Sequence, residues 1–338
     1  MESTDSPEVG LQQLLDTATG FWRSQVLFSA VECGVFGALV DGPATLAELQ
    51  ERTGLHERAA RDLLDSLGAL GLLLREGDRY RNSPVTERHL DPKQPGYVGG
   101  FLMFMSKSLY PAWGRLPELL RTGHLQEGDD SFGEFYRDPD RVRGFMSAMD
   151  SAAAAVTAEL VKWPDWQRYQ NFVDLGGARG NLAGRIALAH PHLKGGCFDL
   201  PPLEPFFTEH MASLDTADRV VFHGGDFRSD PLPEADVLLF GHVLHDWDED
   251  SRRLLVARAH AALRPGGSLL VYDELIDDDR GGPARSLLMS LNMKLVRSGA
   301  SEYSAAEARE WLAEAGFSEV GVQELTATER LIVARKAD

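Results

Sequence analysis

The sequence has few cysteines and fewer basic than acidic residues. Its 338 residues include only two cysteines, Cys33 and Cys197, and their wide separation argues against a disulfide framework and against a Cys-x-x-Cys metal site. Lys and Arg number 34 against 52 Asp and Glu, which gives a formal net charge of −18. This charge opposes non-specific attraction to nucleic acid or an anionic membrane, so we expect neither as a partner. It favours a small neutral or cationic ligand.

The chain also lacks any apolar run long enough to span a bilayer. Its first ten residues, MESTDSPEVG, are polar and acidic, without the basic start and the apolar stretch of a signal peptide. We therefore expect a cytoplasmic protein. A chain of 338 residues that is 43% hydrophobic is long enough for two domains with a sizeable core.

The N-terminal part of the chain has helical periodicity. Large apolar residues recur at helical spacing over Leu11–Val40, with breaks expected at Gly20 and Gly34. This stripe is either core or an interface. In residues 44–83, Thr45 with Glu48 predicts a capping box.

The same segment, 44–83, has the order of a winged helix-turn-helix, because Leu72–Arg75 is expected to form a hairpin with Arg79–Asn82. DNA binding is therefore an alternative function. Between Thr45 and Ser83, however, six basic residues face seven acidic ones, whereas a phosphate-binding surface needs a net positive face. We interpret the module as a dimerisation and substrate-covering element.

The C-terminal part alternates strand and helix patterns. Residues 159–171 form the expected hinge, so we predict two domains, 1–158 and 159–338. Short apolar runs such as Phe172–Leu175 and Val237–Phe240 alternate with helical stretches, which predicts an α/β domain with a mostly parallel sheet. Ligands of such sheets bind beyond the carboxyl ends of the strands. The candidate chemistry lies at those ends: Asp174, Asp199, Asp226, His245 and Asp273.

The segment 171–181, NFVDLGGARGN, predicts a strand, a glycine-rich turn and a helix start. Glycine lets the backbone approach a ligand closely, so Gly176, Gly177 and Gly180 are candidate cofactor-binding residues together with Asp174. A dinucleotide site would also have such a turn. The acid before the first glycine and a second acid, Asp199, followed by Leu200, favour S-adenosylmethionine instead. The alternative interpretation is a set of loop glycines and solvated acids.

The sequence GHVLHDWDED follows the strand Val237–Phe240 and carries His242 and His245. An imidazole titrating near neutral pH is a suitable base for a phenol-like hydroxyl. Either Asp273 or Glu302 can orient His245 and stabilise its imidazolium. A helix-capping or buried structural histidine is the alternative.

Six of the eight methionines lie in three separate segments. Core filling explains any one of them, but together they can converge on a planar aromatic ligand, where thioether contacts are favourable. The segments are Phe101–Met105, Phe145–Met149 and Leu288–Met293, with Met103, Met105, Phe145, Met149, Met289 and Met293 as candidate substrate-binding residues.

Several motifs resemble one enzyme class. HDWDED after GDFRSDPLPEADV, the DLGGARG turn, LRPGG before a strand, and SLLMSLNM followed by SGASEYS are similar to S-adenosylmethionine-dependent O-methyltransferases. This class includes plant caffeate-type enzymes, bacterial antibiotic-tailoring enzymes and acetylserotonin O-methyltransferase. SQVLFSAVECGVF, YRNS and SLNM make the resemblance to the last of these the strongest.

The resemblance implies a Rossmann-like methyltransferase domain preceded by a mostly helical, winged-helix-type dimerisation domain. It implies S-adenosylmethionine as cofactor, S-adenosylhomocysteine as product, no metal, and a homodimer with intertwined N-terminal domains. It also implies roles by position. His245 matches the general base, Asp273 and Glu302 its flanking acids, Asp199 the ribose-binding acid, and Gly225, Asp226 and Phe227 the adenine-side segment; Tyr136, Asp246 and Asn292 match cofactor or substrate contacts.

The sequence departs from the class in two places. Ala178 replaces the usual third glycine and adds a Cβ near the expected cofactor. Gly241 and His242 stand where many relatives have a lysine or arginine near the adenine. Some proteins of this fold use the cofactor site for hydroxylation or cyclisation, so these reactions remain an alternative to methyl transfer, as does a cofactor-binding protein without turnover. We expect an enzyme that methylates an aromatic hydroxyl of a small, secondary-metabolite-like molecule.

Overall fold

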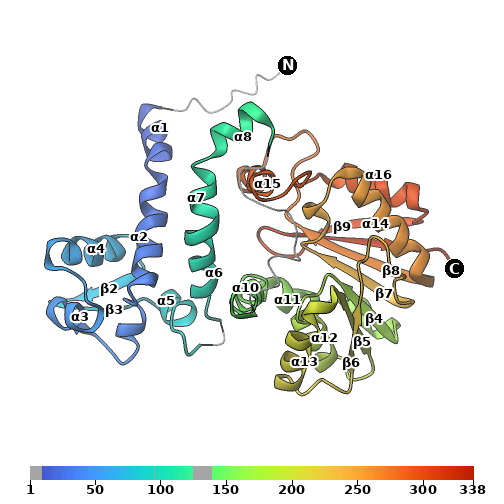
Figure 1. Cartoon of the computed structure of the whole chain (residues 1–338), viewed down its shortest axis with the longest axis horizontal. Coiled ribbons are helices and arrows are strands. Elements are labelled where there is room, and N and C mark those ends of the chain that lie inside the picture. The colour runs from blue at the N-terminus through green and yellow to red at the C-terminus, as the bar shows by residue number, and fades with distance from the viewer. Residues whose placement is uncertain (1–9, 95, 125–138) are drawn as a thin grey trace. The chain divides into compact units, whose positions relative to one another are not determined.

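The computed structural model describes residues 10–94, 96–124 and 139–338. By its internal contacts the chain forms two compact units, Met1–Ser108 and Leu109–Asp338 (Figure 1). The helices that follow Ser108 thus pack with the second unit, whereas the domain boundary expected between residues 158 and 159 stays a prediction. Within the described ranges, no helix has both the length and the apolar character needed to cross a bilayer.

The first unit consists of helices around a small antiparallel sheet, as the sequence predicted. The helices are α1 (Leu11–Ala18), α2 (Gly20–Glu32), α3 (Leu46–Thr53), α4 (Glu57–Ala69), α5 (Pro84–His89) and α6 (Gly99–Phe104), and the strands are β1 (Ala44–Thr45), β2 (Leu73–Glu76) and β3 (Arg79–Asn82).

The predicted capping box is present at the start of α3. The Thr45 backbone N–H donates to Glu48 Oε2 at 2.7 Å, and the Glu48 N–H donates to Thr45 Oγ1 at 3.3 Å.

The hairpin is shifted by one residue from its expected position. Glu76 pairs with Arg79, so the turn contains only Gly77 and Asp78, and Gly77 adopts a φ of +64°. A two-residue turn of this kind needs a left-handed backbone, which glycine supplies without strain. β1 pairs with β3 on the other side. The order α3, α4, β2 and β3 is that of a winged helix.

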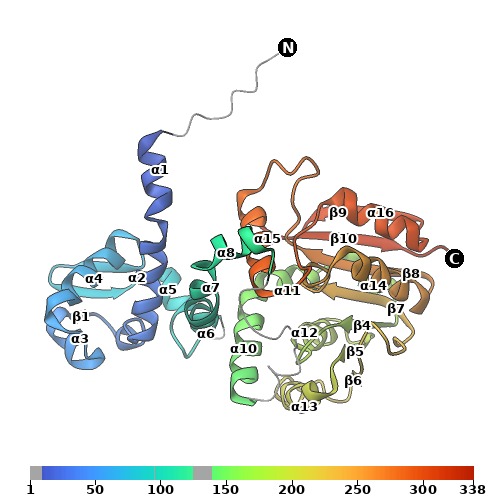
Figure 2. The same ribbon diagram turned by 45° about the horizontal axis from the view of Figure 1, so that its top comes forward.

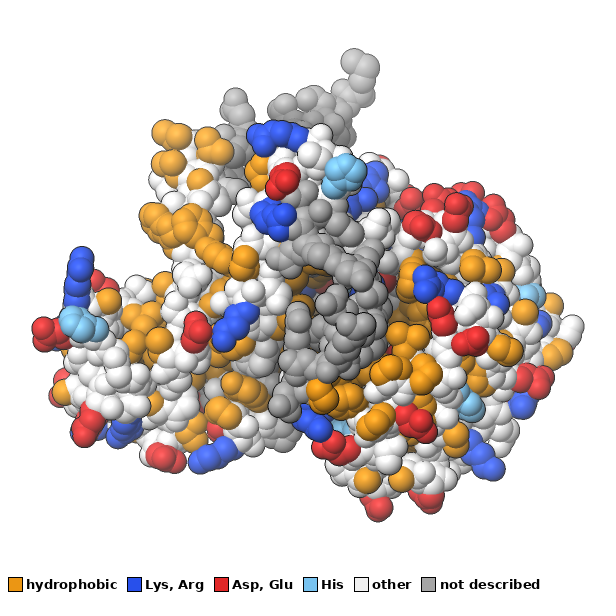
Figure 3. All heavy atoms as spheres, viewed as in Figure 1, with side chains coloured by type: hydrophobic (Ala, Val, Ile, Leu, Met, Phe, Trp, Pro, Cys, Tyr) orange, Lys and Arg blue, Asp and Glu red, His pale blue; other side chains and the backbone are white. Residues whose placement is uncertain are grey.

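The apolar stripe at the N-terminus divides into buried and exposed parts. Phe28 and Ala30 of α2 are buried, whereas Leu11, Trp22 and Leu14 expose 73%, 60% and 59% of their surface. Figure 3 shows hydrophobic side chains gathered over the α1 and α2 region. Because α1 buries no residue within the chain, its large apolar side chains are those of an interface rather than of a core.

The second unit contains a seven-stranded sheet with the order β6-β5-β4-β7-β8-β10-β9. β4 to β8 are parallel, and β10 pairs antiparallel with both β8 and β9. The strands are β4 (Asn171–Leu175), β5 (Lys194–Asp199), β6 (Val220–Gly224), β7 (Ala235–Gly241), β8 (Leu263–Asp273), β9 (Glu319–Glu324) and β10 (Arg330–Arg335). The predicted α/β fold with a mostly parallel sheet is therefore confirmed.

Helices cover both faces of this sheet (Figures 1 and 2). α11 (Ala154–Leu160), α12 (Asn181–Ala189) and α13 (Glu204–Ser213) pack on one face, and α14 (Glu249–Ala262) and α16 (Ala305–Ala315) pack on the other. The further helices of this unit are α7 (Tyr110–Trp113), α8 (Leu116–Thr122), α10 (Pro139–Ala152) and α15 (Ala284–Val296), with the short 3-10 helices η3 (Pro164–Arg168), η4 (Pro201–Leu203) and η5 (Leu244–Asp246). In the first unit, η1 (Gly37–Leu39) is also a 3-10 helix, and the π-helical η2 (Met105–Leu109) spans the boundary between the two units.

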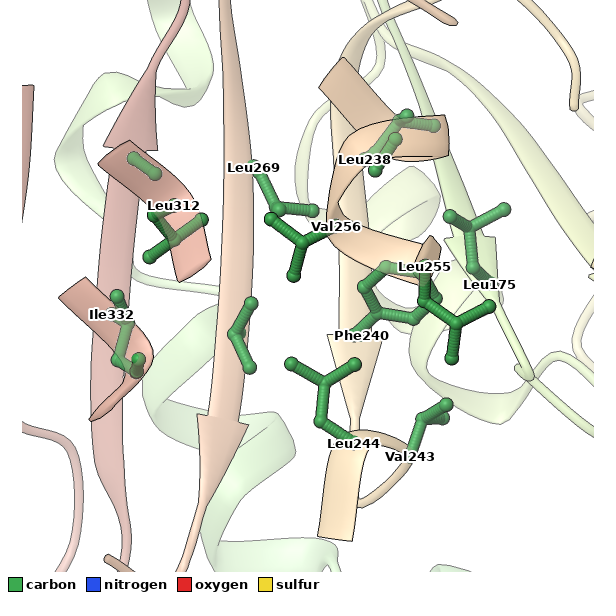
Figure 4. Close-up of a cluster of buried hydrophobic side chains, with 14 of the residues drawn as sticks. Leu175, Leu238, Phe240, Val243, Leu244, Leu255, Val256, Leu269, Leu312 and Ile332 are labelled. Atoms are coloured by element: carbon green, nitrogen blue, oxygen red, sulfur yellow. The ribbon is translucent and has the colours of Figure 1, made fainter. Parts of the chain in front are cut away.

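Successive side chains of a strand point to opposite faces of the sheet, so each strand contributes to two hydrophobic cores, one on each face. On β7, Leu238 and Phe240 join the cluster formed with α14 and α16, whereas Val237 and Leu239 join the cluster formed with α11, α12 and α13. Figure 4 shows Phe240 against Leu255 of α14. Burial on both faces explains why these strands read as continuous apolar runs in the sequence. The rigid sheet fixes the ends of β4, β5, β7 and β8 at a common edge.

Candidate active site

His245 lies in η5, directly after β7, and two carboxylates from distant segments converge on it. Its Nδ1 lies 2.8 Å from Oε1 of Glu302, which is in the loop before α16, and 3.8 Å from Oδ1 of Asp273, the last residue of β8. Both acids are buried, and 12% of the His245 side chain is accessible. Of the two acids that the sequence offered as orienting partners, Glu302 makes the hydrogen bond.

Asp273 and Glu302 change the protonation of His245. Burial by itself lowers the pKa of His245, but the charges of Asp273 and Glu302 outweigh it and raise the pKa to about 10. Burial raises the pKa of Asp273 to about 7, against the opposing charge of His245. The imidazolium is therefore strongly stabilised, which is the state that a general base reaches after accepting a proton.

Further contacts hold the two halves of this cluster together. The backbone N–H of Ser301 donates to the His245 carbonyl at 3.0 Å, and the buried Arg252 donates from Nε to the Leu244 carbonyl at 2.8 Å and also to the Ser301 carbonyl. Tyr303 donates its hydroxyl to Asp273 Oδ2 at 2.6 Å. Sequence reasoning missed Arg252, which stands in no recognised motif, and Tyr303, which stands in the SGASEYS motif but received no role of its own.

His242 also lies near Asp273. Its Nδ1 is 3.7 Å from Asp273 Oδ1, the oxygen that His245 also approaches and one that has no hydrogen-bond partner among the described residues. Burial and the charge of His245 lower the pKa of His242 to about 4. His242, His245 and Asp273 offer three ligand atoms within 4.8 Å of one another, the one such group in the described ranges. His245 Nδ1 is already bonded to Glu302, so the expectation of a metal-free site stays our prediction.

The packing around residue 241 explains why this position holds glycine. A Cβ at this position would lie 1.9 Å from the Tyr272 ring, and that ring also makes an edge contact with His242 at 5.3 Å between centroids. The absence of a lysine or arginine at residue 241 therefore follows from the neighbouring tyrosine. The left-handed φ of +51° at His242 is an uncommon conformation for a non-glycine residue.

The glycine-rich turn connects β4 to α12, as predicted. Gly176 and Gly180 have φ values of +79° and +75°. Added Cβ atoms would lie 2.7 Å from Val243 at Gly176, from Asp174 at Gly177 and from Phe207 at Gly180. The chain's own packing thus requires glycine at all three positions.

Ala178 adopts a φ of +51° in the same turn, which costs an L-residue roughly 1 kcal/mol. Its N–H donates to Asp199 Oδ2 at 2.7 Å, and its side chain packs against a buried cluster of Val142, Met146 and Leu203. The methyl group that the sequence suggested as an obstacle to the cofactor therefore has a packing role. Met146 belongs to this core, so the core-filling interpretation holds for it.

Two acids border the turn. Burial and the nearby charge of Asp199 raise the pKa of Asp174 to about 7. Burial raises the pKa of Asp199 to about 6, although its carboxylate accepts N–H groups from Leu200 and Ala178 at 2.7 Å each. Buried carboxylates of this kind gain stability from a bound cation and from hydroxyl donors. An ammonium group and a ribose supply both, so the residues fit S-adenosylmethionine.

The predicted adenine-side segment follows β6. Gly225 N–H donates to the Asp199 carbonyl at 3.0 Å, and the Asp226 carboxylate accepts Arg228 Nη2 at 2.9 Å. That bond, the largest of several effects, lowers the pKa of Asp226. Phe227 makes edge contacts with Phe240 and Trp247 at centroid distances of 6.2 and 5.9 Å. Arg228 was another residue missed from the sequence.

The predicted substrate-binding residues fall in both units. Asn292 accepts the indole N–H of Trp113 at 3.0 Å, and Asp246 pairs with Arg297 at 3.2 Å. In the second unit, α15 carries Met289, Asn292 and Met293, α10 carries Phe145 and Met149, and η5 carries Asp246. Met103 and Met105 belong to the first unit, so their convergence with the others stays a prediction. Tyr136 lies outside the described residues.

Comparison with known proteins identifies the family. A family model described as the O-methyltransferase domain matches residues 114–318, and one described as the O-methyltransferase dimerisation domain matches residues 15–92. This chain belongs to the S-adenosylmethionine-dependent O-methyltransferases. This chain is 51% identical over 329 residues to the tetracenomycin polyketide synthesis 8-O-methyl transferase TcmO of Streptomyces glaucescens, and the match covers 97% of each chain.

Two further relatives extend the comparison. The N,N-dimethyltransferase OxyT of Streptomyces rimosus is 42% identical over 317 residues, with 92% of each chain covered. Human N-acetylserotonin methyltransferase, solved in complex with S-adenosylmethionine, matches the O-methyltransferase with a TM-score of 0.89, 31% identity and full coverage of both chains. S-adenosylmethionine is therefore the cofactor, as the turn and its acids predicted. TcmO shares more of the sequence than the acetylserotonin enzyme, whose pattern the motifs resembled most.

Proposed function

We propose that this O-methyltransferase methylates an aromatic hydroxyl group of a small secondary metabolite, with His245 as the general base. The observation that carries this proposal is the 2.8 Å hydrogen bond between His245 Nδ1 and Glu302. A bond at Nδ1 directs the proton-accepting role to Nε2. The names of TcmO and of human N-acetylserotonin methyltransferase support an aromatic acceptor.

The chain's residues prepare both reactants. S-adenosylmethionine, when bound, supplies an electrophilic methyl group. Asp174 would hold its ammonium group and Asp199 its ribose hydroxyls, and Gly225, Asp226 and Phe227 would lie beside the adenine. Holding the reactants in line removes much of the entropic barrier to transfer.

The acceptor hydroxyl must lose its proton to become a good nucleophile. His245 Nε2 accepts this proton, and Glu302 and Asp273 stabilise the resulting imidazolium. The pKa of His245, raised to about 10, is close to the ordinary pKa of a phenol, about 10. Such a base is strong, but only a small fraction of it is unprotonated at neutral pH, so the rate should rise with pH toward this pKa.

OxyT supports a second candidate, because its name describes methylation of nitrogen. An amine acceptor needs the same proton-accepting group once nitrogen has gained the methyl. Locating the new methyl group by mass spectrometry and NMR separates the two: an O-methyl product supports the first candidate, and an N-methyl product supports the second.

We also infer a homodimer in which the N-terminal domains intertwine. The dimerisation domain and the exposed apolar side chains of α1 support it. Light scattering tests this state: a mass near 74 kDa is expected, twice the 37.2 kDa of the chain, and Leu14→Glu should shift the mass toward the monomer. A monomeric native protein would contradict it.

Replacing His245 by alanine tests the base. We expect kcat to fall by about 10² to 10⁴, the usual contribution of a general base, while the affinity for S-adenosylhomocysteine stays within threefold. His260→Gln, on α14, serves as the control histidine variant. Retention of more than half of kcat in His245→Ala would exclude this residue as the base.

A further inference from the structure

The carboxylate of Asp273 is held by one hydrogen bond within the described residues. The hydroxyl of Tyr303 donates to its Oδ2 at 2.6 Å, and its Oδ1 has no hydrogen-bond partner in the same ranges. Asp273 and Tyr303 are both fully buried, each 0% exposed. The tyrosine hydroxyl is therefore the group that fixes how this carboxylate is turned.

Two imidazole nitrogens lie just beyond hydrogen-bond range of the other oxygen. Asp273 Oδ1 is 3.8 Å from Nδ1 of His245 and 3.7 Å from Nδ1 of His242, and both distances are too long for a hydrogen bond. Nδ1 of His245 lies instead 2.8 Å from Oε1 of Glu302. Asp273 thus acts on the base as a nearby charge, whereas Glu302 orients it through a hydrogen bond.

A turned Asp273 carboxylate would compete with Glu302 for the Nδ1 proton of His245. Oδ1 would have to approach Nδ1 by only about 1 Å or less to reach the roughly 2.7–3.2 Å of an N–H···O bond. The terminal torsion of an aspartate is broad, so its rotamer preference does not prevent this rotation. A hydrogen bond from a hydroxyl to a carboxylate is among the strong ones, and here it opposes the rotation.

The Tyr303 side chain is itself fixed in place. The guanidinium carbon of Arg252 lies 5.0 Å from the centre of its ring, and the ring of Trp311 lies 5.1 Å away between centroids. Arg252 and Trp311 are 4% and 2% exposed, so both contacts belong to the core. The carbonyl of Tyr303 also accepts the N–H of Ile276 at 3.0 Å. The hydroxyl therefore has a defined position from which to hold Asp273.

Tyr303 and Glu302 are neighbours in one anchored loop. The N–H of Glu302 donates to Ser290 Oγ at 3.2 Å on one side. On the other side, Ser304 Oγ accepts the N–H of Glu307 at 3.2 Å and caps α16. Adjacent residues of this loop thus bind the two groups that meet at the base, because Glu302 binds the imidazole and Tyr303 binds the second acid.

We propose that Tyr303 is a positioning residue for the base and that it acts through Asp273. Its hydroxyl keeps the Asp273 carboxylate turned so that His245 Nδ1 stays bonded to Glu302 and Nε2 faces the acceptor. This inference rests on the proposed function and adds to it the group that keeps the two acids in separate roles.

The test compares two tyrosine variants that lose a buried hydroxyl next to β8. Tyr303→Phe keeps the ring contacts with Arg252 and Trp311. Tyr169→Phe is the matched control, because Tyr169 is 6% exposed and its hydroxyl lies 2.8 Å from that of Ser268, another residue of β8. We expect Tyr303→Phe to lower kcat tenfold or more, with KM for a hydroxyaryl acceptor and Kd for S-adenosylhomocysteine within threefold. Tyr169→Phe should keep kcat within twofold.

A double-mutant cycle tests whether Tyr303 acts through Asp273. Asp273→Asn removes the charge that competes with Glu302 for the Nδ1 proton. Tyr303→Phe should therefore change kcat by less than threefold in the Asp273→Asn enzyme, against tenfold or more in the native one. A purely structural role of Tyr303 would give the same loss in both backgrounds, and that result would overturn the inference.

Proton NMR of the complex with S-adenosylhomocysteine gives a readout that does not need turnover. The Nδ1 proton between His245 and Glu302 should give a low-field resonance that is absent from His245→Ala. It should keep its position in Tyr169→Phe and should shift or broaden in Tyr303→Phe. An unchanged resonance in Tyr303→Phe would overturn the positioning role, even if the double variant is too slow to assay.

These outcomes are distinct from failure of the proposed function. Retention of kcat by His245→Ala overturns the base itself, whatever Tyr303→Phe does. A large loss of kcat in His245→Ala, combined with equal losses from Tyr303→Phe in the native and Asp273→Asn backgrounds, overturns only the role of Tyr303.

Discussion

His245 Nδ1 lies 2.8 Å from Oε1 of Glu302, although 57 residues separate them along the chain. The contact sets which imidazole nitrogen faces the acceptor. A buried carboxylate at hydrogen-bond distance also favours the charged imidazolium. The pair therefore controls both the orientation and the strength of the proposed base.

Glu302→Gln should move the pH profile of the reaction. His245 acts as a base only when it is unprotonated, so log kcat/KM should rise with pH until the raised pKa of His245, about 10, is passed. Loss of the Glu302 charge lowers that pKa, and we expect the acidic limb to move down by about one to two pH units. Above the limb, kcat should fall roughly tenfold or more, because the weaker base is also less well oriented.

Rate profiles from pH 5.5 to 10 test this prediction, with the exposed Glu310→Gln as a control. An acidic limb at the same pH in the Glu302 variant and the native enzyme would contradict it.

Asp174→Asn should stabilise the ligand-free protein at alkaline pH. Because burial raises the pKa of Asp174 from 3.8 to about 7, the folded state disfavours its charged form, and stability falls as the pH rises through this interval. The variant should gain about 4 kcal/mol at pH 8 and only about 1 kcal/mol at pH 4.5, because each unit of pKa shift corresponds to about 1.4 kcal/mol. It should also bind S-adenosylhomocysteine at least tenfold more weakly, since an ammonium partner is lost. Thermal unfolding and calorimetry at both pH values measure the two effects; weaker binding without the alkaline gain would show that the burial cost is small.

Ala178→Gly tests whether the methyl group in the turn obstructs the cofactor. Because the methyl packs on the cluster of Val142, Met146 and Leu203, we expect the Kd for S-adenosylhomocysteine to change less than threefold. Stability should change by less than about 1 kcal/mol, since relief of the left-handed strain offsets the lost packing and the added chain entropy. Tenfold tighter binding would mean that the methyl does face the cofactor.

Gly241→Ala should destabilise the second unit strongly. The added Cβ would lie 1.9 Å from the Tyr272 ring, so the ring must move away from His242, at a cost of about 3 kcal/mol or more. Gly321→Ala is a suitable control, because Gly321 also lies in a strand but has no atom within 4 Å of its ideal Cβ. Chemical denaturation of both variants measures the difference. Equal stability would mean that Tyr272 relaxes without cost.

The fold was largely predictable because its signals are local. β4 is a largely apolar run followed directly by Gly176, β7 is an apolar run that ends at Gly241, and helix α16 begins at a capping box of Ser304 and Glu307. The carboxyl ends of parallel strands share one edge of a sheet, so Asp174, Asp199 and Asp273 could be grouped before any coordinates were known. Boundaries were harder to predict: β8 begins at Leu263, at the start of the LRPGG motif that the sequence analysis placed before the strand, because Leu263 already pairs with Ala235 of β7.

Of the site residues, only those at the ends of these strands could be predicted from the sequence pattern. The choice between Asp273 and Glu302 depended on the path of the loop before α16, and no local pattern specifies that path. Arg252 resembles any surface arginine of a helix in sequence, yet it is 4% exposed. The expectation of a neutral or cationic ligand, taken from the net charge, stays a prediction, because a total charge does not report where single charges lie, such as the ion pair of Arg297 with Asp246 beside the base.

The bonds that join Ser301 and Arg252 to the backbone of η5 have an evolutionary consequence. They fasten the loop of Glu302 to the base largely through backbone groups, and the one side chain of α15 that also holds this loop is Ser290, whose Oγ accepts the Glu302 N–H at 3.2 Å. Substitutions on α15 away from Ser290 can therefore accumulate and change which molecules are accepted, while the proton-transfer geometry is inherited intact. This separation of selectivity from chemistry would allow related enzymes to diversify their products through a few exchanges on one helix.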